Sequence, residues 1–411
     1  LFFFYTNPKM NQSTMPIKNI MIKNAFFFII AAVFSLNLSA QTKPERSPLT
    51  MEFRNYMELK KSGELKKSKT VEGFRTGYVP SPMYLHFNEQ GIKEESRKSA
   101  QALPSYYNLK DFGWVSTVKN QGPVGACWSF STMGAIESRW LKLGFGNSVT
   151  MDLSEQNMAT CHGFEAGIDD GGSDYIAAAY LSRLSGPVTE LSNPYNTTSS
   201  SCKKFGLIKP AFSPKTIFLP KDIAIIKKAI MDYGAVTASV FMGEYLSYFN
   251  KSDNTYFYNG TSPVDHGVLV VGWDDNLTVT GKNAKPLNKG AWIVKNSWGD
   301  TWGDNGYYYV SFEDSRFLSS CTYYPERVEI TEIDTMYMYD FLGATQSFGF
   351  RSDSASAISR FVVAQNNFIN KVGTFVNASG SFIDIEIYDN FTDDSVLTGL
   401  IEKKKKNFCK F

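Results

Sequence analysis

The stretch from Gln121 to Leu143, QGPVGACWSFSTMGAIESRWLKL, decides the fold of this chain. Its first part is rich in glycine and contains a proline, which ends any earlier helix. From Cys127 onward, apolar side chains recur near helical spacing, so we predict a buried helix over residues 127–143. Cys127 then lies at the N-terminus of this helix, where the helix dipole favours negative charge and can lower the pKa of a thiol.

Three apolar segments further along the chain are predicted to be buried strands. They are Asp265 to Trp273 (DHGVLVVGW), Gly290 to Asn296 (GAWIVKN) and Tyr307 to Phe312 (YYYVSF). A helix followed by strands within one unit indicates an α+β fold. We expect this unit to extend over residues 104–325, where the sequence is dense in apolar, glycine and aromatic residues.

The composition excludes several classes of protein. Of the 411 residues, 43% are hydrophobic and 20% are charged, which allows a sizeable core and excludes a wholly disordered or fibrous protein. The 42 basic and 40 acidic residues leave a formal charge of +2, so no nucleic-acid partner is expected. The five cysteines have no CxxC spacing, so we expect no metal site and no cofactor.

The N-terminal region has the pattern of a secretory signal. Met21 is followed by a basic residue, an apolar run over residues 25–38 and a small-residue site that ends at Ala40. The run is short for a transmembrane helix, so residues 21–40 are predicted to be a signal peptide, with a membrane anchor as the alternative. Residues 1–20 are predicted to be an untranslated upstream extension, and no stable membrane insertion is expected after signal cleavage.

Segments of different composition flank the central unit. Residues 41–103 are polar, with a predicted short amphipathic helix over 52–67. From residue 326 to about 400, short alternating runs predict a small β-domain that is partial. These runs are Met336 to Tyr339, Ser347 to Phe350, Arg360 to Val363 and Ile383 to Tyr388. Residues 401–411 (IEKKKKNFCKF) are predicted to be a solvated basic tail or a truncated end.

Four side chains of the central unit are candidates for nucleophilic catalysis. A thiol nucleophile needs a base that takes its proton and a group that orients the base. Cys127 is the candidate thiol, and Gln121 offers an amide donor beside the helix N-terminus, as an oxyanion hole requires. Of the three histidines, His266 begins a predicted strand and is the candidate base, and Asn296 is the candidate orienting group.

The order of these residues resembles that of the papain-like cysteine proteases, whose cysteine signature precedes a histidine and an asparagine. Four motifs agree: QGPVGACWSF, LSEQNMATC (Leu153 to Cys161), VDHGVLVVGW (Val264 to Trp273) and KNSWGDTWGDNGYYYV (Lys295 to Val310). The resemblance covers residues 104–325 and implies a papain-like two-lobed fold, with a helical lobe and a β-barrel-like lobe. It implies that Cys127 is the nucleophile and that His266 is the general base and then the acid. Asn296 would orient the imidazole, and Gln121 would form the oxyanion hole with the Cys127 backbone N–H.

The resemblance also assigns residues that support the reaction. Gly171 and Gly172 match the glycine pair whose backbone holds the substrate as an added strand. Trp298 and Trp302 match indoles that shield the site from water. Gly267 would line the pocket for the residue two before the cleaved bond, where a glycine leaves room.

The cysteines depart from the family pattern in one respect. Most members have a disulfide between the positions of Val124 and of Asp169 or Asp170, so this chain has lost the whole bridge. Cys161 and Cys202 fall where another family disulfide joins, and we predict that they are paired, since export favours oxidation. Two free thiols are the alternative.

The resemblance implies a secreted or cell-surface endopeptidase, made as a zymogen, that hydrolyses peptide bonds through an acyl-enzyme. Residues 41–103 would be its propeptide. Tyr78 to Met83 (YVPSPM) resembles bacterial and archaeal members, in which a lectin-like β-domain often follows the protease; here it would occupy residues 326–400. Its partners would be protein or peptide substrates, with carbohydrate or a cell surface contacted through that domain. The alternatives are a non-catalytic surface-binding protein on the same scaffold and a transglutaminase-like transferase.

Overall fold

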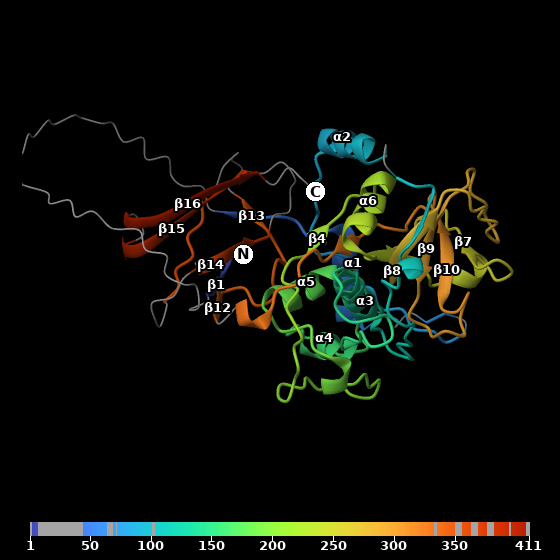
Figure 1. Ribbon diagram of the computed structural model, residues 1–411, viewed down its shortest axis with the longest axis horizontal. Helices are drawn as coiled ribbons and strands as arrows, with labels where there is room; N and C mark the ends of the chain where they lie inside the picture. The colour runs from blue at the N-terminus through green and yellow to red at the C-terminus, as the bar shows by residue number, and fades with distance from the viewer. Residues whose placement is uncertain are drawn as a thin grey trace, which may run out of the picture.

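A computed structural model gives the fold of the chain (Figure 1). It describes residues 2–6, 44–63, 69–70, 72–100, 103–332, 335–349, 356–362, 369–375, 382–393 and 396–407. The predicted signal peptide, residues 21–40, lies outside the described residues. Among the described ones, no helix combines the length and the apolar character needed to cross a bilayer.

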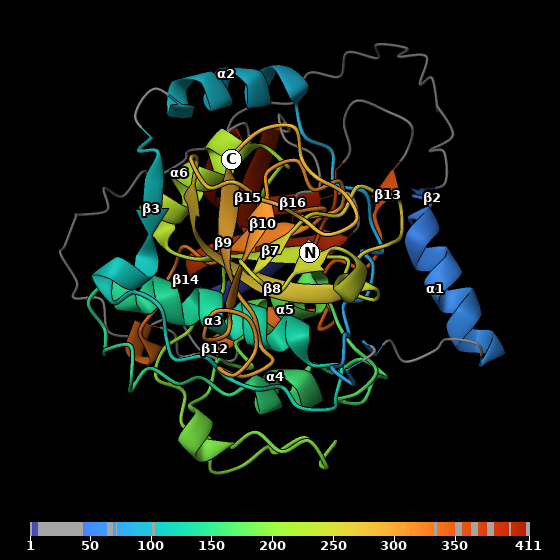
Figure 2. The same ribbon diagram turned by 90° about the vertical axis from the view of Figure 1, so that its right-hand side faces the viewer.

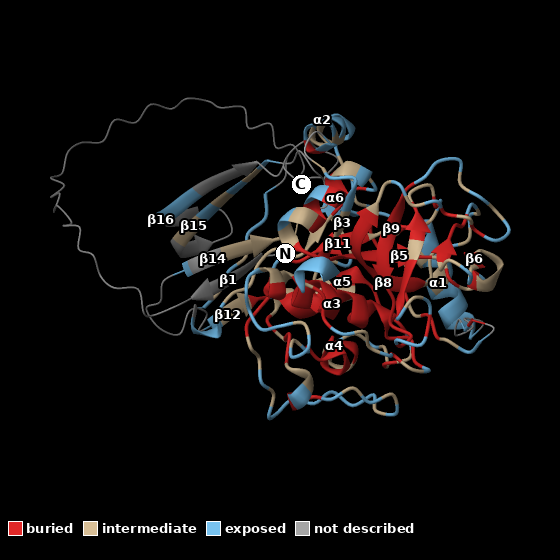
Figure 3. Ribbon diagram, turned by 45° about the vertical axis from the view of Figure 1, so that its right-hand side comes forward, coloured by how far each residue is buried: buried red, intermediate tan, exposed pale blue. Residues whose placement is uncertain are grey.

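The helical lobe is built around α3 (Cys127–Lys142), with α4 (Glu155–Cys161) and α5 (Asp174–Ser182) beside it. All residues of α3 are buried except Arg139 and Lys142. A helix that is apolar on most of its faces must be surrounded by protein, and Figure 3 shows α3 in the buried centre of the molecule. The predicted buried helix over 127–143 is therefore confirmed.

The second lobe is a nine-stranded sheet with the order β4-β11-β5-β8-β9-β10-β7-β6, and β3 pairs with β8. Its central strands are the predicted buried ones, β8 (His266–Asp274), β9 (Ala291–Lys295) and β10 (Tyr307–Ser311). The others are β3 (Tyr106–Asn108), β4 (Ile217–Phe218), β5 (Val236–Val240), β6 (Phe249–Asn250), β7 (Thr255–Tyr256) and β11 (Cys321–Tyr323). Helix α6 (Ile223–Tyr233) and the short helices η1 (Leu109–Phe112), η2 (Glu190–Ser192) and η3 (Tyr245–Ser247) complete the unit.

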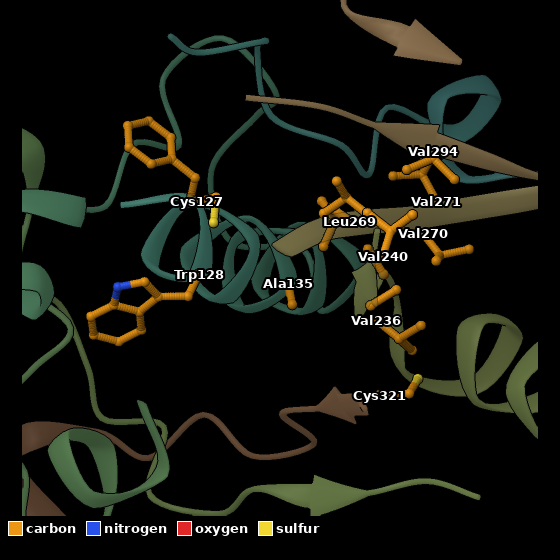
Figure 4. Close-up of a cluster of buried hydrophobic side chains, with 14 of the residues drawn as sticks. Cys127, Trp128, Ala135, Val236, Val240, Leu269, Val270, Val271, Val294 and Cys321 are labelled. Atoms are coloured by element: carbon orange, nitrogen blue, oxygen red, sulfur yellow. The ribbon is translucent and has the colours of Figure 1, made fainter. Parts of the chain in front are cut away.

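The two lobes meet where β8 crosses α3. A Cβ on Gly134 would lie 2.9 Å from Leu269 Cδ2, so the glycine allows the strand to approach the helix closely. Figure 4 shows Leu269, Val240 and Val236 grouped beside α3, with Cys127 and Cys321 at opposite sides of the cluster. We call the contact between α3 and β8 the seam. The α+β class and the two-lobed fold are confirmed.

The segment before the central unit forms two helices joined by extended chain. The first, α1 (Met51–Ser62), ends earlier than predicted because Gly63 adopts the left-handed conformation (φ 75°) that terminates helices. The second, α2 (Glu89–Ala100), was not expected; it packs against α6, as Figures 1 and 2 show. Between the two helices, the chain crosses the seam.

The C-terminal region forms small sheets, apart from the helix η4 (Ile330–Glu332). Strand β1 (Phe2–Thr6) lies between β12 (Thr335–Met338) and β14 (Ile369–Thr374), β2 (Glu45–Arg46) pairs with β13 (Phe348–Gly349), and β15 (Phe382–Asp393) pairs with β16 (Val396–Asn407). Three of the four runs predicted here lie in strands.

Two expectations for this region were wrong. Residues 360–362 of the run Arg360 to Val363 form no strand, and Val362 is exposed. An alternating apolar pattern does not by itself provide a neighbouring strand to pair with. Residues 401–407, predicted to belong to a basic tail, instead continue β16, although residues 401–403 are exposed as a solvated segment would be. There Lys403 pairs with Glu386 of β15, and opposite charges across a strand pair favour that register.

Candidate active site

The candidate nucleophile, Cys127, is the first residue of α3 and is fully buried. The preceding residue, Ala126, caps the helix without a side-chain hydrogen bond. Across the seam, the Gly267 amide of β8 donates a hydrogen bond of 3.3 Å to the Cys127 sulfur. A backbone donor at this distance favours negative charge on the sulfur.

The candidate base and its orienting group come from neighbouring strands. His266 begins β8, Asn296 directly follows β9, and the two strands pair antiparallel. His266 Nε2 lies 2.8 Å from Asn296 Oδ1, which also accepts from the Ser297 amide at 2.8 Å. Within the described part of the chain, the buried Nδ1 of His266 has no hydrogen-bond partner. Nε2 is therefore held by the amide, and Nδ1 is the nitrogen that remains for proton transfer.

Two indoles surround this histidine. The Trp298 ring lies on the imidazole of His266, with 4.7 Å between ring centroids and 31° between planes, and Trp302 meets Trp298 edge-on at 5.1 Å. Both indoles are buried. The hydrogen bond between His266 and Asn296 therefore lies in an apolar surrounding, where it is stronger than in water.

Gln121 is fully buried and its amide is fixed at both ends. Its Oε1 accepts a hydrogen bond of 2.6 Å from the Ser297 hydroxyl, and its Nε2 donates to the carbonyl oxygens of Val124 at 2.8 Å and Arg75 at 3.1 Å. The Ser297 contact fixes the orientation of the amide, so its N–H groups point at the carbonyl oxygens of Val124 and of Arg75, which is distant in sequence.

Residues 74–79 cover the site, and we call them the covering segment. The Phe74 ring stacks on Trp298 at 4.8 Å, and the Trp298 indole N–H donates to the Arg75 carbonyl at 3.2 Å. Gly77 and Tyr78 both donate to the Asp265 carbonyl, at 2.9 and 2.8 Å. The segment therefore lies over Trp298, the Gln121 amide and the start of β8, where the candidate base is.

The glycine pair holds the covering segment as an added strand. The Gly172 amide donates to the Gly77 carbonyl at 2.9 Å, and the Gly172 carbonyl accepts from the Val79 amide at 2.7 Å. A Cβ on Gly171, whose φ is 85°, would lie 2.4 Å from the Gly77 oxygen, and one on Gly172 would lie 2.2 Å from the Trp128 indole. Glycine is required at both positions because backbone and indole approach so closely.

Burial shifts the pKa of the candidate nucleophile and of the candidate base towards their neutral forms in this covered state. It raises the pKa of the Cys127 thiol to about 12, against the hydrogen bonds from Gly267 and Gly77, which lower it. Burial also lowers the pKa of His266 to about 4, although the hydrogen bond with Asn296 acts in the opposite direction. The expectation of a lowered thiol pKa therefore fails here, since desolvation outweighs the helix N-terminus. The covered site holds a neutral thiol and a neutral imidazole.

The predicted disulfide is present, and the lost one has a replacement. Cys161 and Cys202 are bonded, while Cys127 and Cys321 are free. Near Val124, the Gly125 amide donates a hydrogen bond of 3.0 Å to Asp169 Oδ1. Of the two aspartates considered at the family's second cysteine position, Asp169 makes this connection.

The space that Gly267 leaves by having no side chain faces α3. A Cβ there would meet Ser131 Oγ and the Trp128 Cα at 3.3 Å, so the space that glycine leaves lies towards α3. The glycine allows the short contact between its own amide and the Cys127 sulfur. Its place in a substrate pocket stays a prediction.

One group of acidic residues in the described chain has the spacing of metal ligands. Asp152, Glu155 and Glu190 offer carboxylate oxygens within 4.8 Å of one another. Lys119 Nζ lies 2.6 Å from Asp152 and 2.7 Å from Glu155, so an ammonium group already supplies the positive charge. We assign no metal to this group.

Sequence reasoning missed the covering segment. Arg75 and Gly77 lie in a polar stretch without periodicity, and their roles depend on partners far away in the chain. Ser297 could have been found, because it lies inside the KNSWG motif beside Asn296.

The α+β fold thus gathers a thiol, an imidazole and an amide donor at its seam. Residues 103–327 match the family described as papain family cysteine protease, and the chain belongs to this family. It is 33% identical over 234 residues to cathepsin S of Mus musculus, an alignment that covers 56% of this chain and 65% of that protein. It is 30% identical over 243 residues to a cysteine proteinase of Trypanosoma brucei brucei, covering 58% of this chain and 50% of that protein. The chain thus spans between half and two thirds of the length of these relatives.

Two solved structures of one bacterial protein share the fold. One contains the cysteine protease and lectin-like domains of Cwp84, a surface layer associated protein of Clostridium difficile, with a TM-score of 0.56 and 27% identity, covering 70% of this chain and 62% of that one. The other is clostridial Cwp84 after propeptide cleavage, with a TM-score of 0.51 and 30% identity, covering 55% of this chain and 59% of that one. The expected likeness to bacterial members with a lectin-like domain is confirmed.

Proposed function

We propose that this chain is the zymogen of a secreted cysteine endopeptidase. The observation that carries the proposal is the arrangement at the seam. His266 and Asn296 share a hydrogen bond of 2.8 Å, and the buried Cys127 sulfur accepts a hydrogen bond from the Gly267 amide. An intact set of nucleophile, base, orienting group and amide donor favours this proposal over a non-catalytic binding protein. The Gln121 loop and the KNSWG segment favour hydrolysis over transglutaminase-like transfer.

In the proposed reaction, His266 takes the Cys127 proton and the sulfur attacks the carbonyl carbon of the scissile bond. Gln121 Nε2 and the Cys127 amide stabilise the oxyanion. Protonated His266 then gives its proton to the leaving amine, which leaves an acyl-enzyme. A water molecule, deprotonated by His266, hydrolyses the thioester and restores the thiol. Asn296 keeps the imidazole oriented through both steps.

The covering segment supports the zymogen assignment. Its Arg75 carbonyl accepts from the Gln121 amide, which the substrate would need. Its Gly77 and Val79 pair with Gly172, whose backbone would hold the substrate strand. Removal of residues 41–103 would therefore free the oxyanion position and the substrate strand at the same time.

Location and partners belong to the same proposal. Residues 21–40 would direct export, so the enzyme would act outside the cell or at its surface. Its partners would be protein or peptide substrates, and the C-terminal β-region would contact carbohydrate or a cell surface. N-terminal sequencing of the secreted protein tests the export step: a chain that still carries residues 21–40 would contradict it.

Cys127 and Cys321, the free cysteines among the described residues, allow a matched test of the peptidase. We expect Cys127→Ala to abolish hydrolysis of a casein substrate by the processed enzyme. Cys321→Ala, which also removes a buried thiol but lies in β11, should leave the activity unchanged. An epoxide inhibitor should label Cys127 alone, as measured by peptide mass spectrometry. Hydrolysis by the Cys127→Ala variant, or wild-type enzyme that neither cleaves casein nor reacts with the epoxide, would refute the proposal.

A further inference from the structure

The N-terminal end of the proposed propeptide is paired with the C-terminal β-region. Strand β2 lies antiparallel to β13, with Arg46 opposite Phe348, and Figure 2 shows the two strands beside each other above α1. The Ser47 amide donates a hydrogen bond of 2.8 Å to the Ser347 carbonyl, and the Ser347 hydroxyl donates to the Ser47 hydroxyl at 2.7 Å. Gln346 Nε2 donates to the Ser47 carbonyl at 3.2 Å. The propeptide is thus an added strand here, as it is at the glycine pair.

Residues 45–47 are joined to the covering segment by a short path of hydrogen bonds. Thr50 is buried; its amide donates to the Pro82 carbonyl at 3.2 Å, and its hydroxyl donates to the Ser81 carbonyl. Val79, two residues before Ser81, is bonded to the glycine pair. A displacement of the chain at β13 therefore reaches the segment over the active site through few intervening residues.

Helix α5 connects the two places where the propeptide is bound as a strand. Most of this helix is buried, and it begins two residues after Gly172. Directly after its other end, Arg183 donates to the Phe341 carbonyl at 2.6 Å, and a Cβ on Gly343 would lie 2.8 Å from Ala179 Cβ. The chain continues from there to β13 over a few residues. The glycine pair and β13 are therefore held on one rigid element, and the propeptide spans the distance between them.

We propose that the edge of β13 is a binding surface for residues 45–47 of the propeptide, and that this contact helps to keep the covering segment on the active site. The inference rests on the proposed zymogen and assigns a second inhibitory contact to the C-terminal β-region. Two contacts made by one chain strengthen each other, because breaking either one leaves the other to hold the segment nearby. Removal of the propeptide would take from β13 the strand that pairs with it in the described chain.

A proline substitution tests this contact without touching the site. Ser47→Pro removes the amide that donates to Ser347, and the position already precedes Pro48, which favours the extended backbone that proline adopts. We expect epoxide labelling of Cys127 in the intact chain to become about fivefold faster, equivalent to roughly 1 kcal/mol, since one hydrogen bond is lost. Ser47→Ala is the matched control because it keeps the backbone donor, so labelling should stay within about twofold of the wild-type rate.

Substitutions on β13 and beside it separate the contact from the site. The Arg46 guanidinium lies 5.7 Å from the centre of the Phe348 ring. Gln346→Ala and Phe348→Ala should each speed labelling of the intact chain about two- to threefold. Neither should change labelling of the processed enzyme, which lacks the propeptide. Because Gln346 and the lost amide hold the same residue, the double variant Ser47→Pro/Gln346→Ala should label more slowly than the product of the single effects. Hydrogen exchange over residues 45–50 should rise in each of these variants.

The outcomes distinguish this inference from the proposed function. Faster labelling of intact Ser47→Pro, with less than the product in the double variant, supports the binding surface. Labelling of Ser47→Pro at the wild-type rate, a full product in the double variant, or equal changes in intact and processed chains overturns it while the peptidase stands. If Ser47→Pro does not fold, Gln346→Ala and Phe348→Ala decide alone. Processed wild-type enzyme that the epoxide does not label contradicts the peptidase function itself.

Discussion

The Gly267 amide donates a hydrogen bond of 3.3 Å to the Cys127 sulfur across the seam. This donor favours the thiolate, but burial under the covering segment favours the thiol and raises its pKa to about 12. Removing the segment would return water to the sulfur while the Gly267 donor stays in place. We therefore expect the uncovered thiol to ionise at a lower pH than the covered one.

The first prediction concerns alkylation of Cys127 in the intact chain. With a thiol pKa of about 12, the thiolate fraction at pH 8 is very small and rises about tenfold with each pH unit up to pH 10. Iodoacetamide should therefore modify the intact chain slowly, at a rate that rises about tenfold with each pH unit up to pH 10. It should modify the processed enzyme quickly at pH 8. Peptide mass spectrometry gives both rates, with buried Cys321 as an internal control. Equal rates in the two forms would contradict the cover's effect.

A methyl group at Gly77 should displace the cover. A Cβ there would lie 2.1 Å from the Gly125 carbonyl oxygen, and neither backbone can move away easily. Overpacking of this kind costs roughly 1–3 kcal/mol, so Gly77→Ala should speed epoxide labelling of Cys127 in the intact chain about 10- to 100-fold. The control is Gly91→Ala in α2, which lies outside the covering segment. There the nearest atom would be 3.6 Å from the added Cβ, and labelling should not change. Labelling of Gly77→Ala at the wild-type rate would show that the segment does not hold the site closed.

Asn296 offers a test of imidazole positioning. Its Oδ1 is the acceptor beside His266 Nε2, so Asn296→Ala should lower kcat/KM about 100-fold by allowing the ring to turn. Asn296→Asp keeps an acceptor and adds a negative charge, which raises the pKa of His266. The acidic limb of its pH–rate profile should then move to higher pH. An unchanged profile, or full activity of the alanine variant, would argue against a positioning role.

The Cys161–Cys202 disulfide closes a loop with a sequence separation of 41 residues. Loss of a bridge of this length removes about 4 kcal/mol from the free energy of unfolding in the chain-entropy description. Cys161→Ser and Cys202→Ser should each lose this amount, and the double variant no more than either. Urea unfolding measures all three. Additive losses would show that the two thiols act separately.

Elements whose sequence carries a local signal could be predicted. Helix α3 and strands β8, β9 and β10 are long apolar segments, and each lies within a residue or two of its predicted bounds. The places of the candidate site residues in the fold could be predicted as well, because their motifs lie at the ends of these elements; their roles stay a prediction. Cys127 begins α3 and His266 begins β8, so packing the strand on the helix brings them together.

Other features depend on contacts that no local pattern reports. Arg75 is held by Asp169, a partner distant in sequence, and nothing in the polar stretch around it indicates that it is buried. The pKa of the Cys127 thiol is likewise not readable from the local sequence. The helix N-terminus predicts a lowered value, whereas burial by distant residues raises it. Residues 401–407 were expected to form a tail because the strand they pair with, β15, is distant from them in the sequence pattern.

The hydrogen bond from Gly125 to Asp169 changes how the enzyme responds to reducing agents. A thiol enzyme exposed to air must have its sulfur regenerated by reductant, and the same reductant opens disulfides. In this chain, the segment next to the nucleophile is tied by an amide and a carboxylate, which electrons do not break. Reductant that restores Cys127 from a sulfenic acid or a mixed disulfide would therefore leave this connection intact, although it can open the Cys161–Cys202 bridge.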